Sequence, residues 1–196
     1  LKDVLEVFSK AATEVCEGQQ WDMDFETQSD VSLSDYMKMI EYKTAVLLAV
    51  ALQIGGITAG ASLKEQNHLY EFGRNMGIAF QLKDDLLDAF GNLENFGKQV
   101  GGDIMKNKKT YLYLKALELA NTNQHADLIK YFSNTEFAED KVEAVKSIFS
   151  ALDIHNVTSE LMKQYHAKAM QHLDAINSEN KEPLLEFSAM LLDRVS

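Results

Sequence analysis

The chain contains one cysteine and one proline in 196 residues. A lone cysteine, Cys16, cannot form an intrachain disulfide, so we expect a reducing, cytoplasmic location with Cys16 as a core filler. A lone proline, Pro183, leaves almost the whole chain free to be helical. No segment shows the alternating pattern of a strand, and helical periodicity dominates. These scarcities predict an all-α protein, with residues 1–196 forming a single helical domain.

Positive charge is also scarce, with 19 Lys and Arg against 30 Asp and Glu and a net charge of −11. This balance argues against nucleic acid as a partner. Residues 44–63 carry no charge and are long enough to span a bilayer. Gln53, Thr58 and Ser62 interrupt this stretch, and aromatic anchors and a basic cluster are missing beside it. We therefore expect a buried central helix and no stable membrane insertion.

Helical periodicity places helices along almost the entire chain. Ser34 and Asp35 are expected to cap the second helix, and Gly91 to end the third. Beyond about residue 122 the pattern indicates amphipathic packing helices without identifiable chemistry. The expected helices cover residues 2–24, 34–61, 65–91, 108–121, 123–132, 137–152, 155–177 and 181–194.

Residues 80–88, Phe-Gln-Leu-Lys-Asp-Asp-Leu-Leu-Asp, place three carboxylates and an amide in an apolar helical segment. At 100° per residue, Gln81, Asp84, Asp85 and Asp88 share one stripe of the helix. Like charges so close together repel unless a cation lies between them, and carboxylate oxygens suit Mg²⁺ that phosphates also bind. The stripe therefore indicates a metal site, although an ordinary solvated helix face gives the same string.

The segment after this helix, residues 97–110, concentrates glycines and lysines. Backbone N–H groups and cations in such a loop suit an anion. A Walker A loop requires G-x-x-x-x-G-K-[ST], whereas Asn107 stands at the second glycine position counted from Gly102. No strand precedes the loop, so we interpret it as an anion-binding loop of another kind.

Together these residues resemble the second aspartate-rich region of trans-isoprenyl diphosphate synthases, the farnesyl and geranylgeranyl diphosphate synthase family. Two upstream segments fit in the right order. Residues 18–22, Gly-Gln-Gln-Trp-Asp, are similar to the family's G-Q-x-x-D, and residues 36–44 are similar to its Y-x-x-x-x-x-x-K-T. The resemblance implies an isoprenoid-synthase helical bundle around a central cavity, here without its N-terminal helices.

The resemblance also implies an activity, in which an allylic diphosphate ionises with help from Mg²⁺ and alkylates isopentenyl diphosphate. Asp84, Asp85 and Asp88 would hold Mg²⁺ against the leaving diphosphate, with Asp84 the first candidate for a direct ligand. Homodimerisation is implied as well. Three lysines would bind the same diphosphate: Lys43, Lys98 and Lys108.

Three further residues receive roles from the resemblance. Thr44 and Gln81 would direct neutral oxygens at the developing allylic cation, since a carboxylate there would risk capturing it. For Gln81 the alternative is an ordinary buried amide. Asp103 would orient a lysine or a metal-bound water, and the alternative for it is a loop cap.

The sequence departs from the family at Asn107, where glycine is usual, and at Leu112, where proline is common. The first aspartate-rich motif, its arginine pair and the isopentenyl diphosphate pocket are not found. We therefore expect that the sequence is a piece of a longer protein, which puts the activity of these 196 residues alone in doubt. Two other functions stay open: a non-catalytic subunit of a heteromeric prenyl synthase, and a terpene cyclase.

Overall fold

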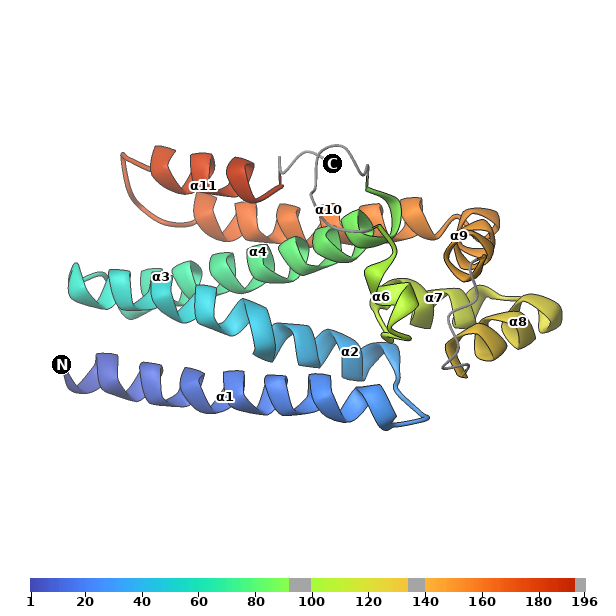
Figure 1. The fold of residues 1–196 in the computed structure, drawn as a ribbon. Coiled ribbons are helices and arrows are strands. Elements are labelled where there is room, and N and C mark those ends of the chain that lie inside the picture. The colour runs from blue at the N-terminus through green and yellow to red at the C-terminus, as the bar shows by residue number, and fades with distance from the viewer. Residues whose placement is uncertain (92–99, 134–139, 193–196) are drawn as a thin grey trace. The chain divides into compact units, whose positions relative to one another are not determined.

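A computed structural model describes residues 1–91, 100–133 and 140–192 (Figure 1). These residues contain helices and no strand, which confirms the all-α prediction. The elements are α1 (Lys2–Thr27), α2 (Leu33–Ile40), η1 (Glu41–Ala45), α3 (Val46–Thr58), α4 (Leu63–Phe90), α6 (Gly102–Met105), α7 (Tyr111–Leu119), α8 (Thr122–Ser133), α9 (Lys141–Ala151), α10 (Ile154–Asp174) and α11 (Glu182–Leu192).

The chain divides into two compact units. The first contains Leu1–Met23, Met37–Gln81 and the described chain from Leu161 onward, and the second contains Asp24–Tyr36 and Leu82–Glu160. Helices α1, α2, α4 and α10 each contribute residues to both units. The single domain expected from the sequence stays a prediction.

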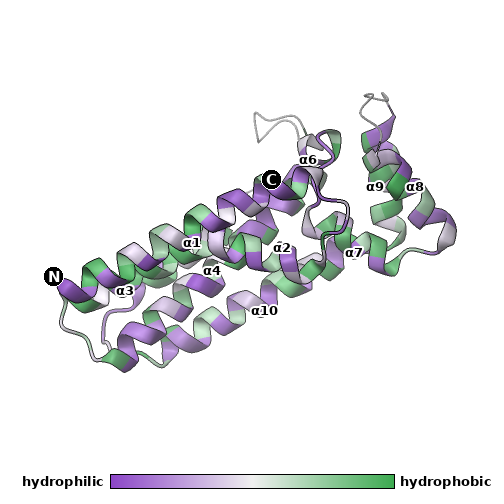
Figure 2. Ribbon diagram, turned by 90° about the horizontal axis from the view of Figure 1, so that it is seen from below, coloured by the Kyte–Doolittle hydropathy of each residue, from purple (hydrophilic) through white to green (hydrophobic). Residues whose placement is uncertain are grey.

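The first unit is built around two apolar clusters. In one, Phe72 and Met76 of α4 are fully buried against Ala169 and Leu173 of α10, and α11 covers the cluster's edge. In the other, Ala11 of α1 packs with Val46 and Val50 of α3. In Figure 2, α1, α4 and α10 carry both hydrophilic (purple) and hydrophobic (green) residues, as expected for amphipathic helices with one face in a core.

The second unit buries aromatic and aliphatic side chains from α7, α8, α9 and the end of α4. Phe149 of α9 is 1% exposed, and its ring centroid lies 6.4 Å from that of Phe90. Tyr113 of α7 stacks on Phe132 of α8 with the centroids 3.8 Å apart. Burial raises the pKa of the Tyr113 hydroxyl to about 12.

Helix ends follow from short polar motifs. Ser32, and not Ser34 as expected, caps α2: its hydroxyl accepts the Asp35 N–H, and Asp35 accepts the Ser32 N–H in return. Ser62 and Glu65 form the same reciprocal pair at the start of α4. The α4 helix ends at Phe90, and the Gly91 N–H donates to the Leu87 carbonyl, so the predicted stop is confirmed.

Cys16 is exposed and is therefore not a core filler. The continuous helical run Leu33–Thr58 is long and apolar enough to cross a membrane by length and composition, with 33% of its most apolar window buried. Buried core helices pass the same test, so this is weak evidence, and the absence of membrane insertion stays a prediction.

Candidate functional site

The three aspartates of α4 occupy different environments in the second unit. Asp85 is 4% exposed, and the hydroxyl of Tyr36, itself 2% exposed, donates to its Oδ2 over 2.5 Å. Asp84 is partly exposed one residue earlier. The buried Tyr36 thus fixes the orientation of one carboxylate of the stripe, a role that the sequence interpretation had not given it.

Asp88 connects the stripe to the loop that follows it. The Asp103 N–H donates to Asp88 Oδ2 over 2.9 Å, and the Gly101 N–H donates to the Asp88 backbone carbonyl over 2.6 Å. A Cβ at Gly102 would lie 3.1 Å from Asp88 Oδ1, so glycine keeps this carboxylate accessible. Burial raises the pKa of Asp88, with a smaller contribution from the Asp103 charge, while the Asp103 N–H opposes the shift.

Lys108 lies in the same loop. Its ammonium is 3.8 Å from Asp103 Oδ1, and its backbone N–H donates to the Asp103 carbonyl over 2.9 Å. Asp103 therefore contacts both the aspartate stripe, through its N–H, and a lysine, through its carboxylate. That Asp103 orients this lysine stays a prediction. Lys98, the other expected loop cation, lies outside the described residues.

In the first unit, Lys43 and Thr44 lie on the π-helical turn η1, in which the Val46 N–H bonds the Glu41 carbonyl. Such turns carry one more residue than an α-helical turn and often occur at functional sites. Asp22 of α1 accepts a hydrogen bond from the Lys43 ammonium over 2.5 Å. A Cβ at Gly18 would lie 2.4 Å from the Lys43 backbone nitrogen, so this glycine lets α1 approach the turn.

The opposite side of the π-helical turn contacts α4. Thr44 Oγ1 donates to Gln81 Oε1 over 3.1 Å, which brings together two residues that were predicted to act on the same cation. A Cβ at Gly77 would lie 2.5 Å from the Ala45 Cα, and one at Gly73 would lie 2.7 Å from the Ala49 Cα. The close approach of α4 to this turn therefore depends on glycines of α4 that the sequence interpretation did not single out.

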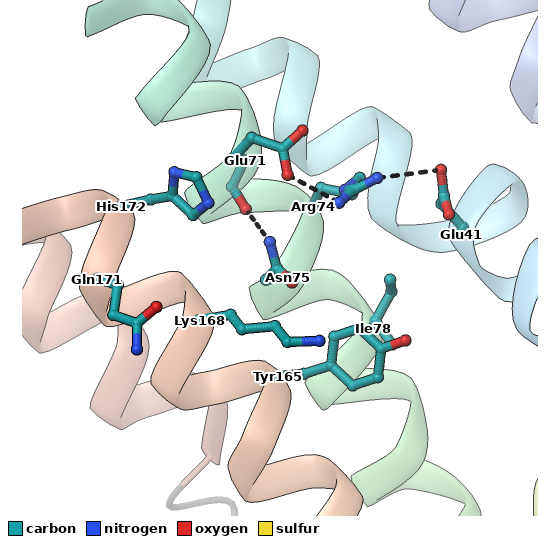
Figure 3. A pocket seen from close by; sticks show the side chains of 9 residues that line it. All are labelled: Glu41, Glu71, Arg74, Asn75, Ile78, Tyr165, Lys168, Gln171 and His172. Atoms are coloured by element: carbon teal, nitrogen blue, oxygen red, sulfur yellow. Dashed lines mark hydrogen bonds and ion pairs between the residues drawn. The ribbon is translucent and has the colours of Figure 1, made fainter. Parts of the chain in front are cut away.

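An ion-pair network also contacts the turn. Arg74 of α4 contacts Glu71 over 2.8 Å and Glu41, the first residue of the turn, over 3.8 Å (Figure 3). These side chains line a cavity of about 240 Å³ together with residues of α10, among them Tyr165 and Lys168. The Arg74 guanidinium thus links the turn that carries Lys43 and Thr44 to the helix that carries Gln81.

Among the described residues, no group of three or more His, Cys, Asp or Glu side chains is arranged to hold a metal ion. The assignment of Asp84, Asp85 and Asp88 as metal ligands, like the roles of the other site residues, stays a prediction. Three histidines contact other side chains: the Nδ1 atoms of His68 and His172 lie 3.1 Å apart, and His166 Nε2 lies 3.0 Å from Ser188 Oγ.

A family model described as Polyprenyl synthetase matches residues 1–152. The chain belongs to this family. It is 34% identical over 195 residues to a short chain isoprenyl diphosphate synthase from Methanothermobacter thermautotrophicus, covering 99% of this chain and 59% of that protein. The polyprenyl synthetase assignment agrees with the resemblance read from the motifs, and the chain spans about three fifths of the length of this relative.

Solved structures of polyprenyl synthetases share the fold. A crystal structure of a geranylgeranyl pyrophosphate synthase matches with a TM-score of 0.90 and 45% identity, over 100% of this chain and 62% of the other. A geranylgeranyl pyrophosphate synthase from Corynebacterium glutamicum, complexed with isoprenyl diphosphate and magnesium, matches with a TM-score of 0.88 and 25% identity, over 97% and 55%. The isoprenoid-synthase helical fold expected from the resemblance is therefore confirmed.

Proposed function

We propose that the protein is a trans-prenyltransferase that condenses an allylic diphosphate with isopentenyl diphosphate. The C–O bond of the allylic diphosphate breaks, the allylic carbon bonds to isopentenyl diphosphate, and a proton is lost. The products are a longer trans-prenyl diphosphate and pyrophosphate. The observation that carries this proposal is the π-helical turn, at which residues of three separate motifs meet: Asp22, Lys43, Thr44 and Gln81.

The chemistry of the donors on α4 fits a divalent metal, and we propose Mg²⁺. Carboxylate oxygens are the ligands that Mg²⁺ takes from proteins when phosphates complete its coordination. Gly102 leaves room beside Asp88 Oδ1, and the Tyr36 hydroxyl orients Asp85. Asp84, Asp85 and Asp88 would hold the ion. When bound, it would neutralise the charge that develops on the departing pyrophosphate.

The remaining site residues would bind the substrate or hold the residues that bind it. Lys43 and Lys108 would bind diphosphate oxygens as point charges, and Lys98 is proposed for the same role from the resemblance. Asp22 holds the Lys43 ammonium, and Asp103 holds that of Lys108. Thr44 and Gln81 would stabilise the allylic cation with the negative ends of neutral dipoles, which cannot form a covalent adduct with it.

The proposal is tested by incubating the full-length protein with a labelled allylic diphosphate, with and without isopentenyl diphosphate. A longer prenyl diphosphate formed only when both substrates and Mg²⁺ are present would support it, and EDTA should abolish the product. Products formed from the allylic diphosphate alone would identify a terpene cyclase. Turnover that requires a separate catalytic chain would identify a non-catalytic subunit and contradict the proposal.

We also propose a cytoplasmic homodimer. The family resemblance suggests the dimer, and exposed apolar side chains on α1 support it: Leu5 and Phe8 are each 54% exposed. One face of the small-residue helix α3 is used within the chain, because Gly73 of α4 packs against Ala49. The single cysteine supports the cytoplasmic location.

A further inference from the structure

Lys141, the first residue of α9, is a buried charge outside every motif described above. It is 2% exposed. Its ammonium donates to the side-chain oxygen of Asn107 and lies 5.4 Å from the centroid of the Phe132 ring. Burying an ammonium costs free energy unless it finds partners such as these. Burial also lowers the Lys141 pKa, in agreement with this cost.

Asn107, the partner of Lys141, adopts a left-handed backbone conformation with φ of 56°. Asparagine tolerates this region better than most residues, but glycine adopts it without a steric cost. The turn at Asn107 therefore carries a polar side chain that glycine would not have, and Lys141 donates a hydrogen bond to this side chain.

The turn at Asn107 sets the position of Lys108. The Asn107 N–H donates to the Ile104 carbonyl over 3.1 Å, and the Lys108 N–H donates to the Asp103 carbonyl over 2.9 Å. The Lys108 ammonium lies beside Asp103, whose own N–H contacts Asp88. A change of backbone conformation at Asn107 would move the backbone nitrogen of Lys108 and would disturb these contacts with Asp103.

We propose that Lys141 is a positioning residue: it fixes the left-handed turn at Asn107 and thereby holds Lys108 in place to bind the substrate diphosphate. This inference rests on the proposed function for the role of Lys108. Lys141 and Asn107 form a side-chain pair at a turn whose backbone conformation glycine would adopt without a steric cost. Each side chain is a hydrogen-bond partner of the other. Removing either one alone should therefore perturb the turn more than removing both.

The experiment compares Lys141→Met, Asn107→Gly and the double variant in the full-length protein. Lys141→Met should raise the KM for the allylic diphosphate about fivefold and lower kcat as well, because Lys108 would bind a diphosphate whose negative charge grows as the C–O bond breaks. It should also speed hydrogen exchange at the amides of Asn107 and Lys108. Asn107→Gly should lower the Tm, because it leaves the ammonium without its acceptor.

In the double variant, the KM should return to within about twofold of the wild-type value, and amide exchange at Lys108 should slow relative to Lys141→Met. Lys146→Met is the matched control, since this lysine of α9 pairs with exposed Glu143 and should leave both readouts unchanged. The inference would be overturned if Lys141→Met changed the KM and the exchange of the Lys108 amide equally in the presence and in the absence of Asn107→Gly. An inactive wild-type protein would refute the proposed function, while the exchange rates would still decide whether Lys141 holds the turn.

Discussion

Single residues in this protein act mainly by holding other residues. Asp22 contacts the Lys43 ammonium, Tyr36 contacts Asp85, and Asp103 contacts both Asp88 and Lys108. Under the proposed function, none of these three residues needs to touch the substrate. They would fix groups with long or rotatable side chains before substrate binds, which lowers the entropic cost of ordering those groups later.

Asp22→Asn tests this role for Lys43. The substitution removes the negative charge opposite the ammonium while keeping the size of the side chain, so Lys43 should lose its fixed position. We expect kcat/KM for the allylic diphosphate to fall about tenfold, because small displacements of positioned groups carry costs of that size. Steady-state kinetics measure the effect, and thermal unfolding should show little change.

Glu17→Gln is the control for Asp22→Asn. It removes one negative charge from the same helix at an exposed position. A similar loss of kcat/KM in both variants would show that the overall charge of α1, and not the contact with Lys43, is responsible.

Tyr113→Phe tests the pKa of about 12 in the second unit. The unfolded chain should release this proton near the ordinary value of 10.0, whereas the folded protein keeps it. Stability from the protonated hydroxyl is therefore fully present below pH 10.0 and is lost as the pH rises toward 12. The Tm of Tyr113→Phe should fall less steeply than that of the wild type over this window. Parallel Tm curves would contradict the assignment.

The sequence predicted the residue types of the site better than their contacts. The spacing of Gln81, Asp84, Asp85 and Asp88 on one helix needs only the α-helical period, so it could be predicted locally. The contact between Asp22 and Lys43 joins residues 21 positions apart, and the contact between Asn107 and Lys141 joins residues 34 positions apart. Such pairings depend on how helices pack, and helical period carries no information about them.

At the scale of elements, glycine placement decides how closely helices approach. Gly77 of α4 faces the Ala45 Cα, and Gly18 of α1 faces the Lys43 backbone. The π-helical turn is thus contacted from two sides by helices that have no Cβ at the contact. The period of apolar residues predicted α2 and α3 as one helix, but it did not distinguish a five-residue π-helical turn from an α-helical one, because both keep the chain helical.

Gly77→Ala should therefore destabilise the protein and displace Thr44 from Gln81. The added Cβ would lie 2.5 Å from the Ala45 Cα, which the backbone can relieve only by moving. Overpacking of this kind costs about 1–3 kcal/mol. Urea unfolding measures the loss of stability, and kcat should fall more than the folded fraction does.

Gly55→Ala is the matched control for Gly77→Ala. Gly55 lies within α3, and a Cβ there meets nothing within 4 Å. Alanine favours a helix over glycine by about 0.5–1 kcal/mol, so this variant should be slightly more stable than the wild type. Destabilisation by both substitutions would indicate that glycine content, and not the contact with Ala45, is what matters.

At the scale of the whole molecule, two compact units share four helices, and the sites predicted from the sequence are distributed between them. Lys43, Thr44 and Gln81 belong to the first unit, while Asp84, Asp85, Asp88, Asp103 and Lys108 belong to the second. Most helices were predicted closely because each has its own periodicity, but the short helix α6 lies in the segment that was predicted as an anion-binding loop. The division into units was not predicted, since it arises from contacts between distant segments.

The proposed homodimer can be tested on the exposed face of α1. Phe8→Glu places a charge in an apolar contact. We therefore expect the wild-type protein to be dimeric and the Phe8→Glu variant to be monomeric at micromolar concentration. Light scattering after size-exclusion chromatography measures the mass. Ser9→Glu, at the exposed neighbouring position, should stay dimeric. A wild-type protein that is monomeric, or a Phe8→Glu variant that stays dimeric, would refute this contact.

The π-helical turn also has a consequence for comparing this protein with its relatives. Deleting one residue between Glu41 and Ala45 would let the chain continue as an ordinary α-helix, with every hydrogen bond of α3 retained. The residues before the deletion would then rotate by about 100° relative to those after it. Alignments of relatives should therefore show no gap in this segment, even where residues other than Lys43 and Thr44 differ, and a relative with a gap here should hold the residues at these two positions differently.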